Sequence, residues 1–139
     1  MADSRAPEIF VDTNVIMRLF DTSDVRQTER SKKLFEDAKA GSIRLVVGPP
    51  VLFELVWVLR STYGREKAEV LDIVEALMNR QGVRVLDADL VAAAVMLARR
   101  TVQGFADAYV AVSAQKYGFK VATYNTRHFL RFEVDLYAL

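Results

Sequence analysis

The residues best suited to chemistry are three carboxylates and one amide that stand beside apolar runs: Asp12, Glu54, Asp107 and Asn125. Clustered carboxylates repel one another unless a cation neutralises them, and ligands that are all oxygen atoms suit Mg²⁺ or Mn²⁺. Such ions activate water and neutralise charge on a scissile phosphate, so these residue types favour metal-dependent hydrolysis of phosphodiesters. The sequence has no cysteine and a single histidine, His128, which excludes Cys-ligated zinc and zinc sites with several His ligands.

Glu54 is the hardest of the four to explain by structure alone. It is the one polar residue in the run from Val51 to Leu59, so we expect it on a largely buried segment. An ionised carboxylate in such a place needs a partner, hydrogen bonds or a metal. If the role of Glu54 is structural, Arg60 or Arg18 would be its partner.

The other three residues also have structural interpretations. Asp12 and Asp107 each stand near the start of an expected helix, where aspartate is a preferred capping residue. Asn125 in Tyr-Asn-Thr is typical of a turn. Both the chemical and the structural interpretation therefore stay open for these positions.

The apolar pattern predicts strands that alternate with helices, which is typical of an α/β fold with a central, mostly parallel sheet. The expected strands are 8–11, 43–47, 83–86, 119–124 and a last short strand near 132–136. The main helices are expected to follow Asp12, to cover 24–41, 65–82 and 105–118, and to begin after 48 and 87. The two helices within 49–79 form a helical hairpin inserted between the second and third strands.

This order of elements would bring the four candidate residues to one edge of the sheet. In an open parallel sheet, functional sites lie beyond the carboxyl ends of the strands. Asp12 and Asn125 directly follow strands, and Glu54 lies one turn into the helix after the second strand. Asp107 lies near the start of the helix that leads into 119–124. We therefore expect the three acids and the amide to meet above one crevice.

Composition places the chain among single-domain globular proteins. Its 139 residues suit one domain, 1–139, and a hydrophobic content of 52% argues against disorder. No apolar run reaches the roughly 18 residues needed to span a bilayer, and the N-terminus lacks the pattern of a signal peptide. We therefore expect a cytoplasmic protein without a membrane partner.

The net charge of +1 provides no global positive field that would mark a nucleic-acid binder.

Five blocks in this order and spacing resemble the PIN-domain family, and within it the VapC-type toxins, over nearly the whole chain. The blocks are VDTNVIMRLF (11–20), PPVLFELVWVL (49–59), YGREKAEVLDIVEAL (63–77), GFADAYVAVSA (104–114) and VATYNTRHF (121–129). The family consists of metal-dependent ribonucleases with a flavodoxin-like, three-layer α/β/α sandwich. The resemblance implies that a metal-bound water attacks the RNA phosphate and leaves a 5′-phosphate and a 3′-hydroxyl.

The resemblance also implies roles for individual residues. Asp12, Glu54 and Asp107 match the acidic catalytic residues and metal ligands, and the implied cofactor is Mg²⁺ or Mn²⁺. Asn125 takes the place of a fourth acid, and Gly104 stands where relatives frequently have Asp. The matching supporting residues are Thr13, a hydroxyl beside the first acid, and Asn14, which braces the loop. Arg18 and Arg127 are candidates for contacting RNA phosphates, although arginines on a surface are also common as structural residues.

A VapC-type toxin is held inactive by a small antitoxin protein encoded by an adjacent gene, and homodimers are a further expectation of the family. An alternative is a PIN-like module that binds RNA or protein with weak or no catalysis, which the departures at Gly104 and Asn125 favour. A receiver-like signalling domain also uses an acidic pocket on such a sheet. A receiver-like domain would have two adjacent acidic residues after the first strand, whereas this sequence has Asp-Thr-Asn there, which disfavours that interpretation.

Overall fold

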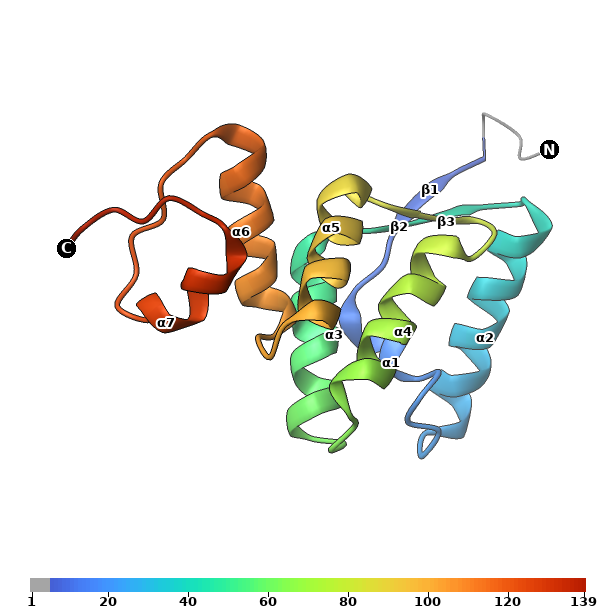
Figure 1. Cartoon of the computed structure of the whole chain (residues 1–139). Helices are drawn as coiled ribbons and strands as arrows, with labels where there is room; N and C mark the ends of the chain where they lie inside the picture. Colours follow the sequence, from blue (N-terminus) through green and yellow to red (C-terminus); the bar gives the residue numbers. More distant parts are fainter. Residues whose placement is uncertain (1–5) are drawn as a thin grey trace.

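The computed structural model describes residues 6–139 and contains a parallel sheet of three strands in the order β1-β2-β3 (Figure 1). The strands are β1 (Glu8–Phe10), β2 (Arg44–Val47) and β3 (Val83–Val85). Ile9 pairs with Leu45, and both neighbours of β2 run parallel to it. Leu45 and Val47 are completely buried, as expected for the central strand of a parallel sheet.

Helices connect and cover these strands, so the α/β sandwich expected from the sequence is confirmed. The helices are α1 (Thr13–Met17), α2 (Val25–Ala40), α3 (Pro49–Ser61), α4 (Lys67–Asn79), α5 (Ala88–Arg100), α6 (Phe105–Tyr117) and α7 (Thr126–Phe129), with a 3₁₀ turn η1 (Leu130–Phe132). Helices α3 and α4 form the hairpin predicted between the second and third strands. Within residues 6–139, no helix combines the length and the hydrophobicity needed to cross a membrane.

Local sequence signals explain where the helices begin and end. The Asp24 side chain accepts a hydrogen bond of 3.0 Å from the Gln27 N–H at the start of α2. Helix α2 ends at Gly41, which adopts a left-handed conformation with a φ of 88°. Pro49 and Pro50 open α3, where their missing N–H groups cost nothing because these N–H groups would have no partner within the helix.

The apolar side chains form two separate clusters. The larger cluster lies between the sheet and helices α1 to α6, and its largest fully buried members include Phe35, Leu52 and Leu71. The smaller cluster joins the inner face of the C-terminal segment to helix α6 and consists of Ala111, Ala114, Val121, Phe129 and Phe132. Figure 1 shows that this C-terminal segment, coloured orange to red, lies on the far side of α6 from the three strands.

The predictions of strands at 119–124 and 132–136 are wrong for this structure. The two segments meet only in one isolated parallel bridge between Val121 and Leu136. The chain after Gly118 folds back on α6, where the rings of Phe129 and Phe132 pack edge to face with their centroids 5.5 Å apart. Packing against α6 is therefore the anchor of the C-terminal segment.

Candidate active site

Asp12 follows β1 and caps helix α1. Its Oδ1 accepts a hydrogen bond of 2.8 Å from the N–H of Thr13, so the capping role that the sequence allowed is real. The Asp12 side chain is nevertheless exposed, and no other hydrogen bond to it is formed within the described residues. One carboxylate oxygen is thus free to bind a ligand while the other holds the helix.

Thr13 is buried beside this carboxylate. Only 2% of the residue is exposed, and its Oγ1 has no hydrogen-bond partner among the described residues. An unsatisfied buried hydroxyl costs about 1–3 kcal/mol.

The segment that carries Glu54 is largely buried, as expected, but the Glu54 side chain itself is exposed. Helix α3 buries Val51, Leu52, Leu55 and Leu59, and Glu54 lies on the opposite, exposed side. It forms no ion pair within residues 6–139, so neither Arg60 nor Arg18 neutralises it. Because Glu54 is exposed, its carboxylate stays hydrated, pays no desolvation cost and is accessible to a ligand.

Asp107 lies in the first turn of α6, where the helix dipole favours a negative charge. It does not cap the helix, because the capping position belongs to Gly104. Its Oδ2 lies 3.2 Å from Nδ1 of His128, which sits in α7. This contact of His128 with a candidate catalytic acid was not predicted from the sequence.

Asn125 precedes α7, and its side chain is exposed. Its backbone N–H donates to the Oγ1 of Thr123 at 2.9 Å, as the turn interpretation predicts. Arg127 is exposed on α7 and forms no ion pair with any described residue. Both residues therefore belong to the C-terminal segment, and neither lies on the sheet.

Helix α3 contacts both α1 and α6, the helices that carry the other two acids. Phe53, next to Glu54 in the chain, packs 5.4 Å from Phe105 and 4.9 Å from Tyr109, measured between ring centroids. Burial raises the pKa of Tyr109, so its phenol stays neutral in this apolar contact. This aromatic cluster fixes the start of α6 against the middle of α3.

The convergence of all four residues is not observed. The donor atoms are carboxylate oxygens of the kind that Mg²⁺ prefers. The part of the chain that the structure describes, however, contains no group of three or more Asp, Glu, His or Cys side chains placed to hold a metal ion. The chemistry of the donors fits a divalent ion, and their arrangement does not form a complete site for one.

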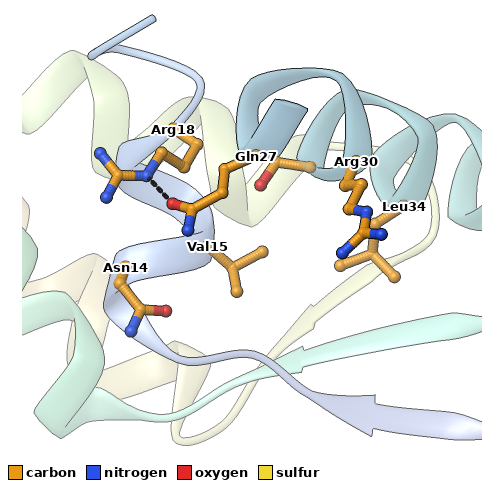
Figure 2. A pocket seen from close by; sticks show the side chains of 7 residues that line it. Asn14, Val15, Arg18, Gln27, Arg30 and Leu34 are labelled. Atoms are coloured by element: carbon orange, nitrogen blue, oxygen red, sulfur yellow. Dashed lines mark hydrogen bonds between the residues drawn. The ribbon is translucent and has the colours of Figure 1, made fainter. Parts of the chain in front are cut away.

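Arg18 borders a hollow of about 430 Å³ between α1 and α2 (Figure 2). Its Nε donates to Oε1 of Gln27 at 2.6 Å, which fixes the side chain and leaves the outer guanidinium nitrogens unpaired among the described residues. Arg30 borders the same hollow from α2, and neither arginine forms an ion pair within residues 6–139. No acidic residue lines the hollow, which includes Asn14, two residues after Asp12, and two arginines. The exposed side chain of Asn14 lines this hollow and forms no hydrogen bond with any residue in 6–139 that would brace the loop.

A lysine clamp, which the sequence analysis missed, holds the loop before α6. The ammonium of Lys67 on α4 donates to the carbonyl oxygens of Ala98, Thr101 and Gln103 at 2.7, 2.6 and 3.1 Å. Burial lowers the pKa of Lys67, with a smaller contribution from the charge of Arg60, while the three acceptors stabilise its charged form. Because this loop leads directly into α6, the clamp positions the turn that carries Asp107.

A small hydrogen-bond network joins the segments that follow α1 and α3. The hydroxyl of Tyr63 donates to Oδ2 of Asp21 at 2.6 Å, and Ser23 donates to Oδ1 of the same carboxylate. The hydrogen bonds from Tyr63 and Ser23 lower the pKa of Asp21 to about 2. Asp21 therefore anchors the turn that follows α1.

Comparison with known proteins identifies the family of this chain. Its sequence matches the PIN domain over residues 9–134. The chain belongs to the PIN domain family. A VapC ribonuclease of Aquifex aeolicus (strain VF5) is 26% identical to it over 119 residues, which cover 86% of this chain and 87% of the relative.

The matched range of this PIN domain includes all the candidate residues from Asp12 to Arg127. It also includes Gly104, where a Cβ atom would meet nothing within 4 Å. An acidic side chain would fit at this position, so the glycine is not required by packing. Because position 104 carries no acidic side chain, the carboxylates available in this region are those of Asp12 before α1, Glu54 on α3 and Asp107 on α6.

Proposed function

We propose that this PIN domain is an endoribonuclease that uses Mg²⁺ or Mn²⁺ and acts as the toxin of a toxin-antitoxin pair. Its main support is the family match together with the VapC ribonuclease that it resembles over 86% of its length. The choice of RNA over DNA and the toxin role rest on that relative. The proposed ligands of the ion are Asp12, Asp107 and Glu54.

The observation that carries the proposal is the exposed carboxylate of Asp12 next to an arginine-lined hollow. Hydrolysis of a phosphodiester needs groups that hold the phosphate as well as groups that act on it. Guanidinium groups bind phosphate oxygens in a bidentate manner, and Arg18 and Arg30 lie on the same hollow (Figure 2). We assign RNA backbone binding to these two arginines, with Arg127 as a further contact from α7.

The chain's own residues suit defined parts of the reaction. Asp12 keeps one oxygen in the helix cap and presents the other to solvent. The imidazole of His128 lies 3.2 Å from the carboxylate of Asp107, so a group of the type that serves in acid–base catalysis stands beside this acid. The hydroxyl of Thr13 is buried directly after the Asp12 carboxylate in the chain.

The test is cleavage of a fluorogenic RNA by the purified chain. We expect cleavage with Mg²⁺ or Mn²⁺ and none after chelation by EDTA. Arg30→Ala should weaken RNA binding and reduce the dependence of binding on salt by about one released counterion. Arg26→Ala, an exposed arginine of the same helix that does not line the hollow, is the matched control. Full activity in EDTA would refute the metal requirement.

A second candidate function is a PIN domain that binds RNA or protein without cutting. The absence of a three-ligand cluster within the described residues favours it, as do Gly104 and Asn125. Calorimetric titration with Mn²⁺ separates the two functions. A binding module should take up almost no metal, whereas the nuclease should bind Mn²⁺ through Asp12 and Asp107.

The proposed regulation is inhibition by an antitoxin encoded beside this chain. Co-expression tests it directly: a cognate antitoxin should copurify with the chain and abolish RNA cleavage. Failure of the neighbouring gene product to bind would remove the toxin role but leave the ribonuclease assignment intact. We also keep the cytoplasm as the predicted location.

A further inference from the structure

The hollow between α1 and α2 has room for more than the phosphate contacts proposed above. Its volume of about 430 Å³ falls within the roughly 300–1,000 Å³ typical of sites for small organic ligands. Val15 and Leu34, both half-buried, supply apolar surface, and Asn14, Gln27 and Ser31 supply polar groups. A mixed lining of this kind fits a flat molecule with apolar faces and polar edges, and a nucleobase is such a molecule.

The two arginines of the hollow lie at its opposite ends. Figure 2 shows Arg18 beside Gln27 at one end and Arg30 beside Leu34 at the other. Oε1 of Gln27 accepts the hydrogen bond of 2.6 Å from Nε of Arg18, which holds this guanidinium at its end. In a nucleic-acid strand, a phosphate stands on each side of every internal nucleoside. Arginines at the two ends therefore suit the phosphates that flank one nucleotide, and the space between them is left for its base.

Asn14 carries a free amide in this space. Its side chain is exposed and forms no hydrogen bond with any residue in 6–139. An asparagine amide offers one acceptor and one donor side by side, which match the N6 amino group and the N7 atom of adenine. Guanine presents two acceptors, O6 and N7, at the same edge, so one asparagine cannot pair with both. The amide therefore favours adenine.

We propose that this hollow binds an adenine base of the RNA substrate and that Asn14 reads the edge of that base. Val15 and Leu34 contact the base, and Arg18 and Arg30 hold the phosphates on either side of it. The inference rests on the proposed function, because it takes RNA as the ligand. Only one residue separates Asn14 from Asp12, so the adenine belongs to a nucleotide close to the phosphate that is cut.

Other occupants fit the lining less well. A lone phosphate pairs with the arginines but leaves Val15 and Leu34 without a contact. An aliphatic side chain of a protein partner covers these two residues, but it removes water from the Asn14 amide without replacing the hydrogen bonds, and this costs free energy. A base satisfies both the apolar and the polar groups.

NMR titration of the ¹⁵N-labelled chain with mononucleotides tests the site in EDTA, where no metal-dependent cleavage takes place. We expect 5′-AMP to shift the backbone amide signals of Val15, Ser31 and Leu34. 5′-GMP should bind at least about five-fold more weakly, which is the lower limit expected for a bidentate contact with a base. Asn14→Ala should abolish this preference. Asn79→Ala, an exposed asparagine at the end of α4 that does not line the hollow, is the matched control and should keep it.

Pentaribonucleotides that differ only in the central base extend the test to RNA. In EDTA, fluorescence anisotropy should show that UUAUU binds at least about five-fold more tightly than UUGUU or UUCUU. Asn14→Ala should bring the three affinities to the same value, because the contacts with the phosphates do not depend on the base.

Three results would overturn the proposal. One is equal affinity of the wild-type chain for 5′-AMP and 5′-GMP, and another is a set of AMP-induced shifts that lies wholly outside the hollow. The third is a copurified antitoxin that occupies the hollow while 5′-AMP shifts none of its signals, which would make it a peptide site. None of these readouts depends on RNA cleavage. Loss of the adenine preference therefore leaves the ribonuclease assignment intact, and a chain that binds adenine but cuts no RNA refutes that assignment alone.

Discussion

Replacement of Lys67 by methionine tests whether the lysine clamp positions α6. The ammonium donates to three carbonyl oxygens within 3.1 Å that belong to the end of α5 and the loop after it. Methionine keeps the apolar stem in place and removes all three hydrogen bonds. The start of α6, and with it Asp107, loses its attachment to α4.

The expected loss of stability follows from these three bonds. A hydrogen bond to a charged group contributes about 1.5–3 kcal/mol. The full sum is not expected, because carbonyl groups at a helix end regain water and the buried ammonium no longer has to be desolvated. We expect Lys67→Met to lower the free energy of unfolding by about 2–4 kcal/mol, a large part of the roughly 5–15 kcal/mol typical of natural domains.

Equilibrium unfolding in urea, followed by circular dichroism, measures this loss. Lys32→Met is the matched control, because Lys32 is exposed and its contact with Glu29 is 4.0 Å long. This control should change the free energy of unfolding by less than about 0.5 kcal/mol. If Lys67→Met also stays within about 0.5 kcal/mol of the wild type, the clamp does not hold the loop and the reasoning is refuted.

Two further predictions concern backbone and charge. Tyr63→Phe removes the main hydrogen bond to Asp21, so NMR titration should show its pKa move from about 2 toward the ordinary 3.8. Because the pKa of Asp21 is lower in the folded than in the unfolded protein, the stabilisation by this bond is complete above pH 3.8 and is lost as the pH falls toward 2. An unchanged pKa of Asp21 in the Tyr63→Phe variant would contradict the assignment. Gly82→Ala should destabilise by more than about 3 kcal/mol in a urea titration, since a Cβ at this left-handed position would lie 2.2 Å from the Ala38 oxygen. Gly64→Ala, also left-handed but in open space, should cost only about 1 kcal/mol, and equal losses in the two variants would show that the close contact is unimportant.

Much of the fold follows from local signals in the sequence. Asp24 and Gly41 mark the two ends of α2, and the structure places its ends there. Each signal acts through the backbone within one turn, by a side-chain cap or by a left-handed residue. The three strands of the sheet were also predictable, since each is a short and mostly apolar run between turn residues.

Glu54 shows how an apolar run can mislead. Trp57, one turn further along α3, is 67% exposed, so an aromatic residue occupies the solvent side of the helix together with Glu54. Helical spacing alone groups Pro50, Glu54 and Trp57 on one face, and this grouping was the available signal. The many apolar residues of α3 masked this grouping, because they suggested a helix that is buried on all sides.

The C-terminal segment and the clamp depend on contacts that local patterns do not encode. The strand propensity of 119–124 says nothing about which edge the segment will meet, and in this structure α6 separates it from β1. Lys67 meets carbonyl groups 31 to 36 residues away, whose acceptor atoms are the same in every amino acid. Pairings of this kind are set by the packing of whole helices.

The most direct test of the central claim is RNA cleavage by Asp12→Asn and Asp107→Asn in the presence of Mg²⁺. Asparagine at position 12 keeps the helix cap, because it caps as well as aspartate, and removes only the negative charge. Both variants should unfold at the same urea concentration as the wild type and cleave RNA slower by orders of magnitude. Cleavage by either variant at the wild-type rate would contradict the account.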